Sequence, residues 1–115
     1  MFYKNARIFT PDFRFVTGGF EVQDGRFGAV LPEEIPADAV DLHGATVIPG
    51  LIDVHSHGNS GADFSDGDYE GLKKMAAYYA SCGVTSFAPA SMTLPYDVLE
   101  KAFATARQLV DEDPE

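Results

Sequence analysis

Thr46-Val-Ile-Pro-Gly-Leu-Ile-Asp-Val-His-Ser-His-Gly58 is the stretch around which the rest of the chain is organised. It begins as an apolar, β-branched run, is broken by Pro49-Gly50, and resumes at Leu51. The resumed part is too short for a helix and is bounded by turn residues, so it predicts a short, mostly buried strand that finishes on two histidines. The ends of such strands are where α/β sheets place their chemistry.

Three polar residues of this strand share one face if the strand is regular. Side chains alternate between faces, which places Asp53, His55 and His57 on one side. The Cα atoms of the two histidines are then roughly 6.5 Å apart, because a strand rises ~3.3 Å per residue. Two imidazole nitrogens at this spacing can bind one metal ion, each at about 2.0–2.1 Å, with Asp53 behind them as a supporting carboxylate. A His-x-His pair also arises by chance, and it is the position at a strand end before a Gly-rich loop that favours metal binding.

Length and composition limit the classes of protein. With 115 residues, 45% hydrophobic and 23% charged, the chain is one small soluble domain or part of a larger one. The net charge of −10 argues against nucleic acid and anionic membranes as partners. Cys82 is the single cysteine, so no intrachain disulfide can form, and we expect it to pack at a helix end without a catalytic role. With no apolar signal segment or membrane-spanning run, these features predict a cytoplasmic protein.

Residues 1–48 predict a small β domain of short antiparallel strands. Phe2–Thr10 is the opening strand, and Asp24-Gly25 is the strongest short-range hairpin signal in the chain. A connection over Leu31–Ala39 leads to two short strands at 40–42 and 46–48, which flank the turn at His43-Gly44. We therefore expect His43 to be a surface turn residue.

After residue 58 the apolar pattern changes from period two to period 3.6. Residues 58–61 are expected to be a flexible connection, and Asp68 can cap a helix that ends near Cys82, with Gly83 as its stop. A second strand is predicted at Thr85–Ala88, followed by a helix that opens at Pro95. The inner positions of that helix are Val98, Leu99, Ala102, Phe103, Ala106, Leu109 and Val110. The chain closes in an acidic tail, 111–115.

The order of predicted elements is thus a small β domain at 1–48, then strand, helix, strand and helix at 49–115. Strands that alternate with helices and run parallel are how an α/β barrel begins. A full barrel takes ~250 residues, so this chain supplies two of eight units and both domains are expected to be incomplete. An unpaired sheet edge and an apolar helix stripe through Val98, Phe103 and Val110 then predict a homo-oligomer.

The residues carry a family resemblance. Pro49-Gly-Leu-Ile-Asp-Val-His-Ser-His57 resembles the first metal-binding strand of the amidohydrolase superfamily, and residues 1–48 are similar to the part-sandwich that precedes the barrel in many members. Within the superfamily, His57-Gly-Asn-Ser-Gly-Ala-Asp-Phe-Ser-Asp-Gly67 and Gly83-Val-Thr-Ser-Phe-Ala-Pro-Ala-Ser-Met-Thr93 resemble N-acetylglucosamine-6-phosphate deacetylases. Two departures are Asn59-Ser60, in place of a Gly-richer loop, and Ala90, where relatives often carry Thr.

The resemblance implies an α/β fold in which part of a small β-sandwich is followed by the first two βα units of a metal-dependent TIM-type barrel. It implies that the complete protein deacetylates N-acetylglucosamine 6-phosphate, an amino-sugar phosphate, with a divalent ion such as zinc or iron. His55 and His57 would be metal ligands and Asp53 their support. The family's catalytic residues lie on later strands, so no catalytic residue is expected in this chain and the isolated chain is expected to be inactive.

Two alternatives remain open. One is a different amidohydrolase, similar to dihydroorotases or hydantoinases, which share Pro-Gly-x-Ile-Asp-x-His-x-His but lack the phrase at Thr85–Thr93. The other is a non-catalytic fragment that folds or associates without turning over any substrate. The residues that bind the sugar phosphate are not identified by the sequence; Gly58–Gly61 could offer backbone N–H groups to an anion.

Overall fold

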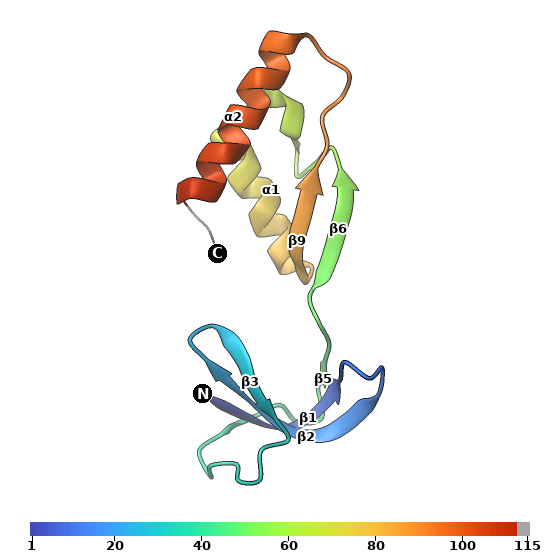
Figure 1. The fold of residues 1–115 in the computed structure, drawn as a ribbon, viewed down its shortest axis with the longest axis vertical. Coiled ribbons are helices and arrows are strands. Elements are labelled where there is room, and N and C mark those ends of the chain that lie inside the picture. The colour runs from blue at the N-terminus through green and yellow to red at the C-terminus, as the bar shows by residue number, and fades with distance from the viewer. Residues whose placement is uncertain (113–115) are drawn as a thin grey trace. The chain divides into compact units, whose positions relative to one another are not determined.

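The computed structural model describes residues 1–112 of a mixed α/β chain (Figure 1). The chain forms two compact units, Met1–Pro49 and Gly50–Glu115. Asp111 and Glu112 of the expected acidic tail belong to the last helix, and residues 113–115 lie outside the described part. No helix within residues 1–112 has the length and apolarity needed to cross a membrane.

The first unit is a five-stranded sheet built around its opening strand. Its strands are β1 (Phe2–Phe9), β2 (Phe15–Gln23), β3 (Arg26–Val30), β4 (Val40–Asp41) and β5 (Thr46–Val47). The order is β3-β2-β1-β4, and β5 pairs with β1 as well. The predicted hairpin is confirmed: Asp24 and Gly25 join β2 to β3 with φ of 51° and 73°, as a two-residue turn between antiparallel strands requires.

A small apolar core lies on this sheet. Ala6, Ile8 and Phe20 are buried there, and the ring of Tyr3 stacks on that of Phe20 with centroids 4.8 Å apart. The cluster joins β1 and β2, because alternate residues of each strand face the same side of the sheet.

Strands β4 and β5 correct the prediction that this unit is wholly antiparallel. Both pair with β1 in parallel, with Val40 opposite Tyr3 and Thr46 opposite Arg7. The reason is the connection over residues 31–39, which is long enough to return the chain to the start of β1, so that the next residues run in the direction of β1.

The turn at His43-Gly44 does not form a hairpin, because β4 and β5 on either side of it both run parallel to β1. Both turn residues have left-handed φ, 51° and 83°, and the Gly44 N–H donates to the Asn5 carbonyl oxygen at 2.6 Å, which keeps the turn on the same edge of β1. His43 is exposed, as predicted for a turn residue, and its backbone N–H donates to the Asp41 carboxylate.

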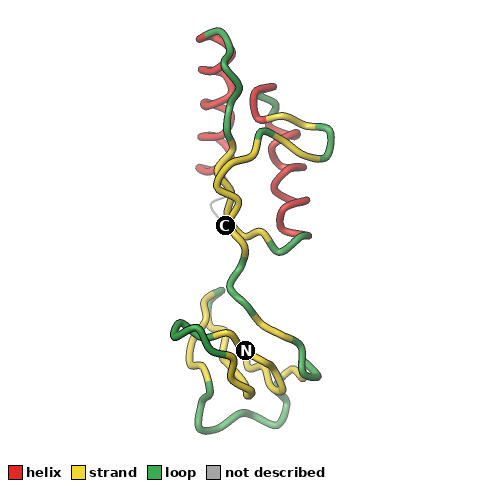
Figure 2. The backbone as a smooth tube through the Cα atoms, turned by 90° about the vertical axis from the view of Figure 1, so that its right-hand side faces the viewer, coloured by secondary structure: helices red, strands yellow, loops and turns green. Residues whose placement is uncertain are grey.

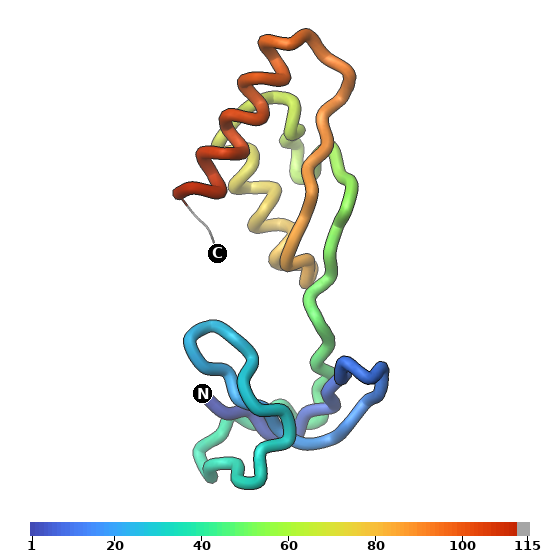
Figure 3. The backbone as a smooth tube through the Cα atoms, viewed as in Figure 1, coloured from blue at the N-terminus to red at the C-terminus, as the bar shows by residue number. Residues whose placement is uncertain are grey.

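The second unit alternates strands and helices. Its elements are β6 (Leu51–Ser56), β7 (Gly58–Asn59), β8 (Ala62–Asp63), the 3-10 helix η1 (Phe64–Asp66), α1 (Tyr69–Ser81), β9 (Val84–Pro89) and α2 (Tyr96–Glu112). Strands β6 and β9 pair in parallel. Figure 3 shows the backbone running out along β6, back along α1, out along β9 and back along α2. The predicted order of strand, helix, strand and helix is confirmed.

The helix signals in the sequence act where they were expected. The Asp68 carboxylate accepts the Glu70 N–H at 3.2 Å and caps α1, and Gly83 ends the helix with φ of 78°. Helix α2 begins after Pro95, whose carbonyl oxygen accepts the Leu99 N–H at 3.1 Å. Cys82 caps the end of α1 but its side chain is exposed, which corrects the expectation that it packs there, because the chain turns away at Gly83 before another element covers it.

The core of this unit joins η1, α1 and α2. Phe64, Leu72, Met75 and Ala102 are buried together, and Phe87 of β9 packs against them. Figure 2 shows the two long helices beside the paired strands.

Two apolar surfaces of the second unit are exposed, and only the exposure of β6 differs from expectation. Strand β6 was expected to be mostly buried, yet Ile52 and Val54 are 68% and 77% exposed, because among residues 1–112 only β9 pairs with β6. On α2, Ala102 is buried whereas Phe103 and Val110 are 56% and 62% exposed. Ala102 packs with buried residues of η1 and α1, whereas the exposure of Phe103 and Val110 agrees with the expected incomplete cover of this apolar stripe.

Candidate metal centre

The two histidines at the end of β6 come together in space. The rings of His55 and His57 meet edge to face, with centroids 5.1 Å apart and planes at 89°. His55 is exposed and His57 is partly buried. The sequence therefore placed the pair correctly as neighbours at a strand end.

Strand β6 reaches these histidines through a β-bulge. Asp53 pairs with Phe87 and Ser56 with Pro89, so β6 advances three residues while β9 advances two. The extra residue interrupts the strict alternation that was assumed from Asp53 to His57. Bulges are frequent next to functional sites, where they re-aim a side chain.

Asp53 is engaged with the backbone of this bulge. Its Oδ1 accepts the backbone N–H of His55 at 3.0 Å. Within the described residues no hydrogen bond joins Asp53 to either imidazole ring. The carboxylate thus holds the main chain that carries His55.

The Ala90 carbonyl sets the orientation of the His57 ring. Nδ1 of His57 lies 2.7 Å from that oxygen, and because a carbonyl only accepts, Nδ1 carries the proton in the neutral ring. Nε2 then keeps its lone pair, as a metal ligand must. The sequence did not identify Ala90 as the partner of His57. A signal was available, because Ala90 directly follows β9 and parallel strands bring their carboxyl ends to the same edge.

A hairpin follows the histidines where a flexible connection was expected. Strands β7 and β8 are joined by Ser60 and Gly61, whose φ values of 54° and 78° suit a two-residue turn. The segment continues into η1, where the Phe64 N–H donates to the His57 carbonyl oxygen at 2.7 Å. The dipeptide Ser60-Gly61 was the sequence signal from which this hairpin could have been predicted.

A tyrosine of α1 supports the strand end from the other side. The hydroxyl of Tyr79 donates to Oγ of Ser56, between the two histidines, and its ring lies 4.7 Å from that of Phe87. Tyr79 is buried. The sequence alone did not predict this contact between Tyr79 and Ser56.

The donor set fits part of a metal site. Two imidazoles converge and one of them has its Nε2 left open, but residues 1–112 contain no group of three His, Cys, Asp or Glu that could hold a metal ion. Two nitrogens leave a tetrahedral site half filled. Within the part of the chain that the structure describes, these two imidazoles could hold a metal ion only together with further ligands.

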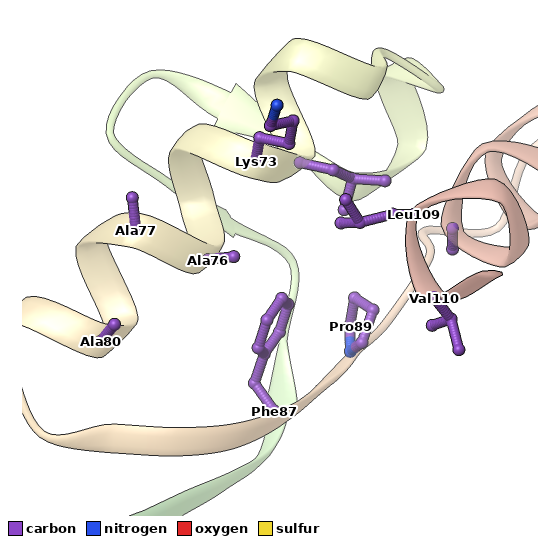
Figure 4. Close-up of a pocket in the computed structure, with 10 residues that line it drawn as sticks. Lys73, Ala76, Ala77, Ala80, Phe87, Pro89, Leu109 and Val110 are labelled. Atoms are coloured by element: carbon purple, nitrogen blue, oxygen red, sulfur yellow. The ribbon is translucent and has the colours of Figure 1, made fainter. Parts of the chain in front are cut away.

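A separate groove of about 490 Å³ lies between α1, β9 and α2 (Figure 4). Figure 4 shows Phe87 and Pro89 between the two helices, with Ala76 on one wall and Leu109 on the other. Lys73 is the one charged residue in its lining, and neither histidine contributes to it. Apart from Lys73, the residues that line this groove are apolar.

Comparison with known proteins finds N-acetylglucosamine-6-phosphate deacetylases among the relatives in both sequence and structure. The N-acetylglucosamine-6-phosphate deacetylase of Vibrio furnissii is 40% identical over 68 residues, which are 59% of this chain and 17% of the relative. The structure matches that of the same enzyme from Pasteurella multocida with a TM-score of 0.86 and 27% identity, over 96% of this chain and 30% of that one. No protein-family model matches the chain.

A second solved structure carries a ligand. It is a variant of the deacetylase of Mycobacterium smegmatis in complex with N-acetyl-D-glucosamine-6-phosphate, with a TM-score of 0.85 and 25% identity, over 98% of this chain and 30% of that one. Dihydroorotases of Bacillus species also match, at 38% identity over 48% of this chain and 13% of the relative. The resemblance to N-acetylglucosamine-6-phosphate deacetylases is thus confirmed, and the chain spans less than a third of the length of these relatives.

Proposed function

We propose that this chain is the N-terminal part of a metal-dependent hydrolase that converts N-acetylglucosamine 6-phosphate to glucosamine 6-phosphate and acetate. The observation that carries the proposal is agreement with a deacetylase in fold over 96% of the chain, together with a histidine pair at the end of β6. The sugar phosphate held by the Mycobacterium smegmatis protein supports an amino-sugar phosphate as the substrate.

We further propose the architecture of the complete protein. The sheet of the first unit would be part of a small β-sandwich, and β6-α1-β9-α2 the first two βα units of a TIM-type barrel. Parallel pairing of β6 and β9, each followed by a helix, supports this arrangement. The single cysteine supports a cytoplasmic location, and the exposed apolar side chains of β6 and α2 support a homo-oligomer.

The chain's own residues would hold and orient a divalent ion, zinc or iron. When bound, such an ion polarises an amide carbonyl and lowers the pKa of a water molecule. His57 would present Nε2, because the Ala90 carbonyl occupies Nδ1, and His55 would approach from the edge of that ring. Asp53 would keep the bulged backbone in place for His55. Proton transfer to the leaving amine is assigned to no described residue.

A dihydroorotase-like function is the second candidate, favoured by the matches to those enzymes. These matches cover about half of the chain, whereas the fold agreement with the deacetylases includes both units and α2. The longer agreement is the reason to place the deacetylase first.

The test uses the protein that contains this chain, with the metal removed by a chelator and restored as zinc or iron. Acetate release from N-acetylglucosamine 6-phosphate that disappears with the metal and returns with it is the expected result. Absence of acetate release in the loaded protein, with hydrolysis of dihydroorotate instead, would replace the first candidate by the second.

A further inference from the structure

A closed circuit of hydrogen bonds surrounds His57. Its ring reaches the Ala90 carbonyl through Nδ1 at 2.7 Å, and its own carbonyl accepts the Phe64 N–H at 2.7 Å. Two residues after Ala90, the Met92 N–H donates to Oγ of Ser65 at 3.2 Å. Because Ser65 follows Phe64, the circuit returns to His57 through η1.

The Met92 hydrogen bond restrains the peptide that follows Ala90, and this peptide contains the carbonyl that contacts the His57 ring. The Ala90 N–H is already held by the Ser56 carbonyl at 2.8 Å, which restrains the peptide before Ala90. The carbonyl of Ala90 belongs to the next peptide and can rotate about the bond from Cα. Its direction therefore depends on what holds the residues that follow, and the Met92 N–H is the nearest such anchor.

Ser65 is a firm anchor for that N–H. The preceding Phe64 is 1% exposed and lies in the core of the unit. The Ser65 N–H donates to the Asp63 carboxylate at 2.7 Å, and Asp66 returns a bond to the Asp63 N–H, which completes a capping box. The hydroxyl of Ser65 thus projects from a short helix whose backbone is held at both ends.

We propose that Ser65 is a positioning residue: through Met92 it orients the Ala90 carbonyl, which holds His57 in the tautomer with Nδ1 protonated and Nε2 open to a metal ion. The metal part of this inference rests on the proposed function, and the tautomer part does not. A hydrogen bond of ordinary strength corresponds to a change of about fivefold in the ratio of two states. Loss of the Ser65 hydroxyl is therefore expected to lower the ratio of the Nδ1–H to the Nε2–H form by about that factor.

The experiment reads the tautomer directly in the metal-free 115-residue chain. Long-range ¹H–¹⁵N spectra at about pH 8, where an ordinary histidine is neutral, distinguish the protonated ring nitrogen of His57. Ser65→Ala should shift the His57 nitrogens toward the Nε2–H form, and Ser65→Thr, which keeps a hydroxyl, should restore the wild-type shifts. Ser81→Ala is the matched control, because it removes a hydroxyl that bonds the Tyr78 carbonyl at the far end of α1.

Two further measurements keep the inference testable. Met92→Pro deletes the donor and leaves Ser65 in place, so it decides the matter if Ser65→Ala does not fold. A His57 tautomer that is unchanged in the folded variants would overturn the inference whatever the metal does. Titration with Zn²⁺ is scored separately: weaker binding in Ser65→Ala than in Ser81→Ala supports the metal part, and wild-type binding that leaves the His55 and His57 resonances in place contradicts the proposed function instead.

Discussion

The hydroxyl of Tyr79 in α1 donates a hydrogen bond to the hydroxyl oxygen of Ser56 in β6. Ser56 stands between the two histidines, so a buried side chain of the first helix holds the strand at the point where the candidate metal centre begins. The Tyr79 ring lies against Phe87 of β9 and thus links three elements.

Tyr79→Phe removes that hydrogen bond and keeps the ring. The variant is expected to be less stable than the wild type by about 1 kcal/mol, the usual contribution of one hydrogen bond, in urea unfolding followed by far-UV circular dichroism. Tyr78→Phe is the control, because Tyr78 is half exposed. Equal effects of the two variants would show that the bond to Ser56 contributes nothing.

His55→Ala and His57→Ala are each expected to lower zinc affinity in the protein that contains this chain by more than about tenfold, since loss of even an outer partner of a metal ligand costs about 10–100-fold. Competition with a chromogenic chelator measures this. His43→Ala is the matched control, because His43 is exposed in a turn of the first unit. Metal affinity that is insensitive to both site variants would exclude the pair as ligands.

Asp53→Ala tests the support of the bulge. Loss of the bond to the His55 N–H is expected to destabilise the chain by about 1 kcal/mol and to speed amide exchange at His55, whereas Asp53→Asn keeps an acceptor oxygen and should recover most of both. Asp111→Ala, which removes an exposed ion pair with Arg107, should change stability by less than about 0.5 kcal/mol. Exchange at His55 that is equal in all three variants contradicts the role.

The isolated 115-residue chain is expected to release no acetate from N-acetylglucosamine 6-phosphate. Its described residues bring together no group of three His, Cys, Asp or Glu that could hold a metal ion. An enzymatic acetate assay with added zinc checks this against a sample without protein. Release above that background would mean that the chain alone forms a working site.

The exposed apolar side chains of the second unit predict self-association of the chain. Ile52 and Val54 on β6 are exposed next to an open strand edge, and such edges pair readily with another copy. Light scattering after gel filtration should show a dimer or larger assembly, and Val54→Lys should shift it toward monomer. A wild-type monomer at micromolar concentration would refute this expectation.

Local rules predicted much of the chain correctly. The Asp24-Gly25 hairpin, the Asp68 cap and the start of α2 after Pro95 depend on residues within a few positions of one another, and each was found where the sequence indicated it. The neighbouring histidines were predicted for the same reason, since two residues on one strand end need no distant partner to meet.

Long-range relationships were predicted less well. The parallel pairing of β4 and β5 depends on where a nine-residue connection returns the chain, and the bulge in β6 depends on its register with β9. The Ala90 carbonyl meets His57 only because those two strands end at one edge. The periodicity of one segment carries no information about these pairings, so the sequence predicted that the two histidines are neighbours but not which groups orient them.

During synthesis, one edge of strand β1 stays unpaired until the strands that pair with it have been made. One edge can close once β2 exists, but the other needs Val40 and Thr46, which pair with Tyr3 and Arg7. At ~5–20 residues added per second, that edge stays open for roughly two to seven seconds on the ribosome. Its closure joins residues far apart in the chain and is therefore slow compared with hairpin formation. The nascent sheet is completed only as β6 begins to emerge, and until then β1 is the segment of this unit most open to pairing with a neighbouring chain.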